Sequence, residues 1–107
     1  MKEIKFDKKF DKLKKQSWTT VREYNEENIE KYSHIGDVFE VIVNEKSNGL
    51  AVLKNKKVLS GNEIDFYTLA DDITINEKLD WDWYFKIKSM KKCLFLTFEI
   101  LVPAEVK

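Results

Sequence analysis

The stretch Cys93-Leu-Phe-Leu-Thr-Phe-Glu-Ile-Leu-Val102 carries the strongest strand signal in this chain of 107 residues. Apolar residues recur at every second position, which is the period of a β-strand with one face in a core. Pro103 follows directly and ends the strand, because proline has no backbone N–H to donate to a sheet. The residues expected to face the core are Leu94, Leu96, Phe98 and Ile100.

The rest of the chain shows weaker strand and helix patterns. Strands are predicted over residues 2–6, 17–22, 38–44 and 50–59, the last of which Lys54–Lys57 could interrupt. A turn over residues 45–49 joins the third of these strands to the fourth. Helices are predicted over residues 8–15, 63–70 and 77–88, and residues 24–35 are expected to form a loop with one helical turn.

This order of elements indicates an α+β fold. The strands are too few and the connections too irregular for a doubly wound parallel sheet. We expect a small, mostly antiparallel β-barrel with three peripheral helices, and a single domain over residues 1–107.

Composition excludes several classes of protein. No apolar run approaches the roughly 20 residues that a membrane-spanning helix needs, so no membrane partner is expected. Residues 1–6 lack the apolar core of a signal peptide, and a cytoplasmic location follows. The single Cys93 and single His34 cannot form a disulfide or a zinc site, so neither a metal nor a cofactor is expected. We expect Cys93 to be inert in the core and His34 to be a loop residue without a catalytic role.

The charges balance overall but are unevenly placed. Nineteen Lys and Arg residues face nineteen Asp and Glu residues, which argues against a strong nonspecific DNA binder. Residues 1–16 nevertheless carry seven lysines against three acids, whereas residues 23–40 carry six acids against one lysine. A small basic groove is compatible with this distribution.

The candidate functional segment is the strand predicted at residues 17–22. Alternation places Trp18, Thr20 and Arg22 on one face. Arginine offers a planar fork of donors to phosphate or to a base edge, and tryptophan can stack on a base. Lys12, Lys14 and Lys15 would add positive potential at the mouth of a cleft. The plain alternative is that Arg22 pairs with a nearby acid, that Trp18 plugs the barrel end and that the lysines are solvated.

Three short segments resemble the ASCH family of the PUA-like superfamily. They are Leu13-Lys-Lys-Gln-Ser-Trp-Thr-Thr-Val-Arg22, then Ile35-Gly-Asp37, then Phe95-Leu-Thr-Phe98. The resemblance is specific at six positions, which are Thr20, Val21, Arg22, Gly36, Asp37 and Phe98. It implies a PUA-like pseudobarrel with a cleft beside the Thr-x-Arg strand and a role with RNA or a modified nucleoside or nucleotide. The ligand-binding residues are then Lys15, Ser17, Trp18, Thr20 and Arg22.

The resemblance also implies a possible enzyme. Some small bacterial ASCH proteins are amidohydrolases that remove the acetyl group from N4-acetylcytidine with a lysine, a threonine and a glutamate. Thr20 matches the threonine, Ser17 stands at the lysine position with Lys15 nearby, and the glutamate position falls near Asp71 or Asp72. The catalytic set implied here is Thr20, Lys15 and Asp72, because a threonine hydroxyl needs a neighbouring base to become nucleophilic. For Asp71 and Asp72, a role at a helix boundary is the plain alternative.

A third interpretation is a structural or protein-interaction domain. The run Trp81-Asp-Trp-Tyr-Phe85 is denser in aromatic residues than one buried helix face can absorb. Trp81 or Phe85 would then line a cleft or form a dimer contact, in a monomer or a weak homodimer. The plain alternative is that all the rings pack over the barrel.

Overall fold

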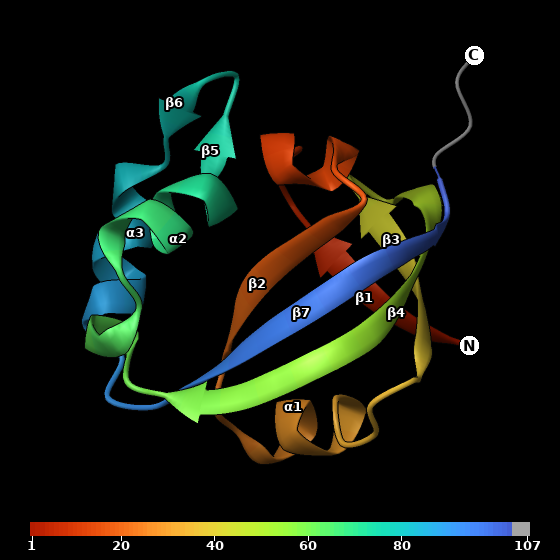
Figure 1. The fold of residues 1–107 in the computed structure, drawn as a ribbon, viewed down its shortest axis with the longest axis horizontal. Helices are drawn as coiled ribbons and strands as arrows, with labels where there is room; N and C mark the ends of the chain where they lie inside the picture. The colour runs from red at the N-terminus through yellow and green to blue at the C-terminus, as the bar shows by residue number, and fades with distance from the viewer. Residues whose placement is uncertain (104–107) are drawn as a thin grey trace.

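A curled, mixed sheet of five strands forms a half-barrel in the computed structural model, which describes residues 1–103 (Figure 1). The strand order is β1-β3-β4-β7-β2. β1 pairs with β3 in parallel, and the other three pairings are antiparallel. The strands are β1 (Lys2–Phe6), β2 (Ser17–Glu23), β3 (Val38–Val43), β4 (Lys46–Leu59) and β7 (Cys93–Val102).

Short helices cover the ends of this sheet. α1 (Glu26–Lys31) lies below the sheet in Figure 1, and α2 (Phe66–Asp72) and α3 (Trp81–Lys88) lie together on the left. A two-stranded hairpin, β5 (Thr74–Ile75) and β6 (Lys78–Leu79), separates α2 from α3. Two single 3-10 turns, η1 (Asp11–Lys14) and η2 (Gly61–Glu63), complete the fold. The expected α+β class with three helices and a barrel-like sheet is confirmed.

The core lies inside the curl of the sheet. Alternate residues of β3 and β7 are buried there, including Phe39, Val41, Leu96 and Phe98. Trp18 stacks on Phe98 with ring centroids 5.0 Å apart, and further rings pack edge-on around them. The predicted bounds of β1 and β7 are confirmed. Both strands could be recognised in the sequence because apolar residues alternate regularly along them.

The helix predicted over residues 8–15 is wrong: the structure has only the four-residue 3-10 turn η1. Its N–H groups at Leu13 and Lys15 donate to carbonyls three residues earlier, which is the 3-10 pattern. Lys12 and Leu13 are both buried in this turn. No side chain caps the N-terminus of η1, and Lys15 is already extended, so the chain enters β2 without a full helical turn.

The two other helix predictions are displaced. The helix expected at residues 63–70 begins later, at Phe66, because Ser60 and Glu63 form a capping box on η2 and Asp65 caps α2. The helix expected at residues 77–88 begins at Trp81, where Asp80 accepts a hydrogen bond from the backbone N–H of Trp83.

Two identical Asn-Glu pairs make the tight turns that these predictions missed. Asn44-Glu45 and Asn76-Glu77 all have positive φ angles, between 50° and 67°. Two consecutive left-handed residues form the turn whose twist matches a β-hairpin, and asparagine tolerates that conformation. The first hairpin therefore turns at residues 44–45 and not at 45–49. β4 then runs without a break through Lys54–Lys57, with a register shift between Leu53 and Asn55.

Gly36-Asp37 joins α1 to β3, and its contacts hold neighbouring strands together. Gly36 has a φ of 98°, a conformation that disfavours residues with a Cβ, and its N–H donates to the carbonyl of Leu53. The N–H of Leu53 donates in return to the carbonyl of Asp37, whose carboxylate pairs with Lys2 at 2.7 Å. These contacts fix the start of β3 against β4 and β1.

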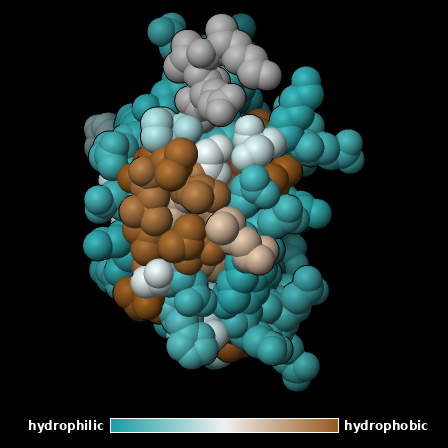
Figure 2. Space-filling view, turned by 90° about the vertical axis from the view of Figure 1, so that its right-hand side faces the viewer, coloured by the Kyte–Doolittle hydropathy of each residue, from teal (hydrophilic) through white to brown (hydrophobic). Residues whose placement is uncertain are grey.

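The outer face of the sheet retains apolar side chains. Leu50 and Val52 on β4 are half-buried, and Leu101 on β7 is 52% exposed. Apolar side chains gather on this side of the molecule in Figure 2. The inner face of the sheet is therefore buried in the core, whereas the outer face is partly exposed and partly apolar.

Candidate functional site

A cleft of about 500 Å³ lies beside β2, between the beginning of the chain and α3. Thr20 and Arg22, two residues apart on β2, both contribute to its wall. Alternation along the strand places them on the same face, as the sequence predicted. The cleft is lined by Lys5, Phe6, Asp7, Lys8, Phe10, Lys12, Thr20, Val21, Arg22, Asp80, Asp82, Trp83 and Lys86.

Arg22 lies in this wall without a carboxylate partner. Its guanidinium donates one hydrogen bond to the carbonyl of Lys5 at 3.1 Å and lies 4.8 Å from the centre of the Phe6 ring. Within residues 1–103 it forms no ion pair, and its buried Nε has no hydrogen-bond partner. Burial lowers the pKa of Arg22 from its ordinary value, and the acidic groups Tyr32, Asp72 and Asp7 oppose that shift. The terminal N–H groups of the guanidinium make only this one hydrogen bond within residues 1–103, so they keep donors for a ligand, whereas the buried Nε is not accessible to one.

Lys12 and Asp72 form a buried ion pair behind the same wall. Their side chains are 3% and 1% exposed, and the ammonium lies 2.9 Å from one carboxylate oxygen. The hydroxyl of Thr19 donates to that same oxygen at 2.8 Å, and the Lys12 ammonium donates to the carbonyl of Thr19 at 2.5 Å. The second oxygen of Asp72 is buried without a hydrogen-bond partner. α2, η1 and β2 are thus joined by one polar cluster.

Aromatic rings surround the Lys12 ammonium on its other sides. It lies 5.4 Å from the ring centres of Phe6 and Phe10 and 5.8 Å from that of Trp18. Burial lowers the pKa of Lys12 and raises the pKa of Asp72, while the attraction between the two opposes both shifts. Perturbed titratable groups of this kind gather at functional sites more often than elsewhere.

Thr20 lies next to this cluster on the chain. It is 3% exposed and lines the cleft, whereas its neighbour Thr19 faces Asp72 from the opposite side of the strand. The carbonyl that Lys12 contacts belongs to the peptide bond that joins Thr19 to Thr20. Thr20 is therefore next in sequence to the residue that binds both Lys12 and Asp72, and Lys12 and Thr20 both line the cleft.

The structure places Trp18 and Ser17 outside this cleft. Trp18 is 3% exposed in the core, with its indole N–H buried and unpartnered, so it cannot stack on a ligand base. The alternation of the sequence correctly predicted that Trp18 shares a face of β2 with Thr20 and Arg22. At the position of Trp18, however, Phe98 and Phe6 cover that face. The hydroxyl of Ser17 donates to the carbonyl of Phe98 and is part of the sheet edge.

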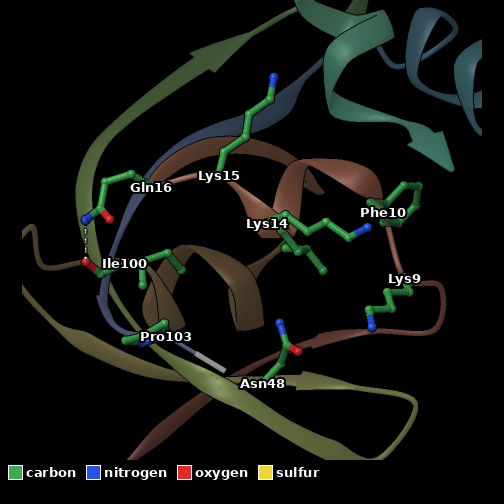
Figure 3. A pocket seen from close by; sticks show the side chains of 9 residues that line it. Lys9, Phe10, Lys14, Lys15, Gln16, Asn48, Ile100 and Pro103 are labelled. Carbon is green, nitrogen blue, oxygen red and sulfur yellow. Dashed lines mark hydrogen bonds between the residues drawn. The ribbon is translucent and has the colours of Figure 1, made fainter. Parts of the chain in front are cut away.

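Lys15 also lies elsewhere, beside a second hollow of about 290 Å³. Figure 3 shows Lys9 and Lys14 bordering this hollow, while the Lys15 side chain extends away from it. The Lys15 ammonium pairs with Asp71, an exposed residue, and not with Asp72. The family resemblance suggested Lys15 with Asp72, because Lys15 is near the lysine position at Ser17; in the structure the lysine that pairs with Asp72 is Lys12.

The residues that sequence reasoning left out of the site are Phe6, Phe10 and Trp83, and Lys12 was expected only as a positive charge at the mouth of the cleft. Trp83 and Lys86 form the α3 side of the cleft, with the Lys86 ammonium 5.3 Å from the Trp83 ring centre. Lys12 lies between Phe10 and Leu13 in the sequence, and Asp72 directly precedes the apolar Ile73. A charged residue next to apolar residues in each of two segments was the available signal for a buried pair.

In residues 1–103 no three His, Cys, Asp or Glu side chains gather closely enough to hold a metal ion. No helix there is both long and apolar enough to cross a bilayer.

Comparison with known proteins adds no relative: no family model matches the chain, and neither a curated protein nor a solved structure matches it. The geometry of the cleft is therefore the basis on which a function is assigned.

Proposed function

We propose that the cleft beside β2 holds a nucleotide or a modified nucleoside, free or at an unpaired position of an RNA, in an ASCH-type, PUA-like domain. The observation that carries the proposal is that Thr20 and Arg22 line one cleft, while the guanidinium of Arg22 makes one hydrogen bond and no ion pair within residues 1–103. The curled sheet, with its cleft beside the Thr-x-Arg strand, is compatible with the family resemblance.

The lining chemistry suits an aromatic ligand with negative charge. Five cationic side chains and three carboxylates line the cleft, and one of the carboxylates, Asp80, is already paired with Lys8 at 2.6 Å. The guanidinium of Arg22 can donate to a phosphate or to a base carbonyl, and Thr20 can donate or accept beside it. Trp83 offers a ring on the opposite wall, where stacking on a base contributes about 1–3 kcal/mol.

Calorimetric titration with cytidine monophosphate and with a short single-stranded RNA tests this proposal. We expect weak, salt-sensitive binding that falls at least tenfold in Arg22→Lys, which retains the charge but loses the fork of donors. Lys14→Ala is the matched control, because it removes a lysine that lines only the second hollow. Equal binding by the wild type and Arg22→Lys, or an equal loss in Lys14→Ala, contradicts the proposal.

A second candidate function is an amidohydrolase acting on an acylated nucleoside, which the Lys12–Asp72 pair beside Thr20 specifically favours. In this reaction the Thr20 hydroxyl attacks the acyl carbon and gives its proton to the Lys12 amine. The amine then returns a proton to the leaving nitrogen, and water hydrolyses the acyl-threonine ester. Only a neutral amine accepts a proton, so the Lys12 ammonium must first pass a proton to Asp72. Burial assists this transfer, because it lowers the pKa of Lys12 and raises the pKa of Asp72.

Acetate release from N4-acetylcytidine tests this candidate. We expect turnover that is lost in Thr20→Val and in Lys12→Met but retained in Lys15→Met, because Lys15 pairs with Asp71 away from the cleft. An absence of turnover at high enzyme concentration, with cytidine binding intact, leaves a binding domain without this activity.

A further inference from the structure

Five aromatic side chains form a continuous surface on α2 and α3, on the left of the molecule in Figure 1. We call this surface the aromatic patch. Each ring contacts at least one other, with centroids 5.3–5.9 Å apart. Its members are Phe66, Tyr67, Trp81, Tyr84 and Phe85.

The aromatic patch is too exposed to be explained by packing within the chain. Tyr67 is 84% exposed, Phe85 64%, Trp81 49% and Phe66 44%. At about 150–250 Å² for each fully exposed aromatic side chain, these four leave roughly 350–600 Å² of ring surface in water. Patches of about 300–600 Å² are the largest on an ordinary monomer and are often functional.

The charges on α3 are self-complementary. Asp80 and Asp82 precede Tyr84 by four and two residues, and Lys86 and Lys88 follow it by two and four. Asp82 and Lys86 are exposed beside Trp81 and Phe85, on the side of the helix away from the buried Ile87. In the isolated chain Lys86 has only a loose contact with Glu23, at 3.6 Å.

A polyanion is a poor match for this surface. Of the acids on α2, α3 and their caps, Asp72 is buried with Lys12, and Asp71 and Asp80 pair with Lys15 and Lys8. Asp65 and Asp82 remain against Lys86 and Lys88, so the surface has no net positive charge to attract phosphate, whereas opposite charges on one helix fit a copy of itself.

We propose that the aromatic patch binds a second copy of this chain, forming a twofold dimer in which the two α3 helices run antiparallel beside Tyr84. With the twofold axis at Tyr84, each residue of one α3 faces the residue of the other α3 that lies equally many positions from Tyr84 in the opposite direction along the chain. Asp82 of each copy then meets Lys86 of the other, and Phe85, one residue from the axis, lies close to Phe85 of the other copy with Trp81 beside it. Such an interface uses the same surface on both subunits, and buried Trp and Tyr rings dominate its affinity.

Sedimentation equilibrium of the full chain with charge-swapped variants tests this arrangement. We expect the wild type to dimerise at micromolar concentration, and Asp82→Lys and Lys86→Asp each to be monomeric. An equimolar mixture of these two variants regains a dimer, because each lysine then faces an aspartate across the axis. Phe85→Glu is expected to be monomeric with an unchanged far-ultraviolet spectrum, and Tyr24→Glu, which alters an exposed aromatic residue outside the patch, is expected to dimerise normally.

Three results overturn the proposal. A wild-type chain that stays monomeric at several hundred micromolar removes the dimer. A dimer that survives Phe85→Glu places the interface elsewhere. If Phe85→Glu instead weakens binding of a single-stranded RNA while sedimentation is unchanged, the patch is a nucleic-acid surface. None of these outcomes depends on whether a nucleotide binds beside β2.

Discussion

Replacing one member of the Lys12–Asp72 pair should destabilise the fold far more than replacing both. In Asp72→Asn the asparagine can still accept from Thr19, but the Lys12 ammonium is left 3% exposed without a counter-charge. Removing one partner of a buried pair costs about 3–5 kcal/mol. For a domain of this size that corresponds to a fall in melting temperature of roughly 12–40 °C, at about 4–8 °C per kcal/mol.

The double variant Lys12→Met/Asp72→Asn should recover most of this loss. Methionine extends into the same space between Phe6, Phe10 and Trp18, and no charge remains buried. We therefore expect a destabilisation of about 1–2 kcal/mol, well below the sum of the two single variants. Urea denaturation of the four proteins at pH 7 measures the free energies of unfolding.

The exposed pair Lys15–Asp71 supplies the matched control. Its side chains are 54% and 57% exposed, so its own double-mutant cycle should give a coupling below about 1 kcal/mol. Additive losses at Lys12 and Asp72, or equal coupling in the two cycles, would refute the claim that this pair is buried and mutually dependent.

Three further predictions concern stability and reactivity. Gly61→Ala should lower the free energy of unfolding by about 3 kcal/mol or more, because the added Cβ would lie 1.7 Å from the carbonyl oxygen of Ile87. Asn62→Ala, at an exposed position of the same turn, should lower it by less than about 1 kcal/mol, and urea denaturation measures both. Hydrogen bonds from two backbone N–H groups hold the pKa of Asp11 below its usual 3.8. The ionised Asp11 therefore stabilises the fold above that pH, and this stabilisation is lost as the pH falls. The melting temperature of Asp11→Asn should be lower than that of the wild type at pH 6 and equal to it at pH 2. Burial raises the pKa of Cys93, which is fully buried, so a thiol reagent should leave it unmodified in the native protein and react in urea; rapid native labelling would contradict its placement.

The sheet could be predicted from the sequence because its strands carry regular alternation. β7 needs no tertiary information, since its apolar residues fall at every second position and Pro103 ends it. β1 and β3 follow for the same reason. Thr20 and Arg22 could be placed on one face of β2 by the same period, and the structure brings both to one cleft.

The short helices could not be predicted because tertiary contacts decide them. Residues 8–15 contain apolar positions that fit a helix, but Lys12 has a partner 60 residues later in Asp72, and reaching it favours the 3-10 turn. The helix expected from residue 77 fails locally, since Asn76-Glu77 adopts the left-handed turn of a hairpin. Lys12 was therefore expected only at the mouth of the cleft, and the role of the lysine in the catalytic set was given to Lys15.

Trp18 illustrates a different limit. Alternation gives the side of a strand but not the depth at which a residue lies. Trp18, Thr20 and Arg22 share a face, yet the first lies against Phe98 in the core and the last lies at the cleft wall. The curl of the sheet sets this gradient, and it follows from pairings between residues that are far apart in sequence.

Backbone amide shifts of the labelled chain during titration with cytidine monophosphate test the central claim most directly. If the cleft beside β2 is the binding site, the largest and saturable changes will fall on Thr20, Arg22 and Trp83, and Asn48 in the second hollow will stay in place. Changes centred on Asn48 and Lys14, or none at millimolar nucleotide, would contradict the assignment of this cleft.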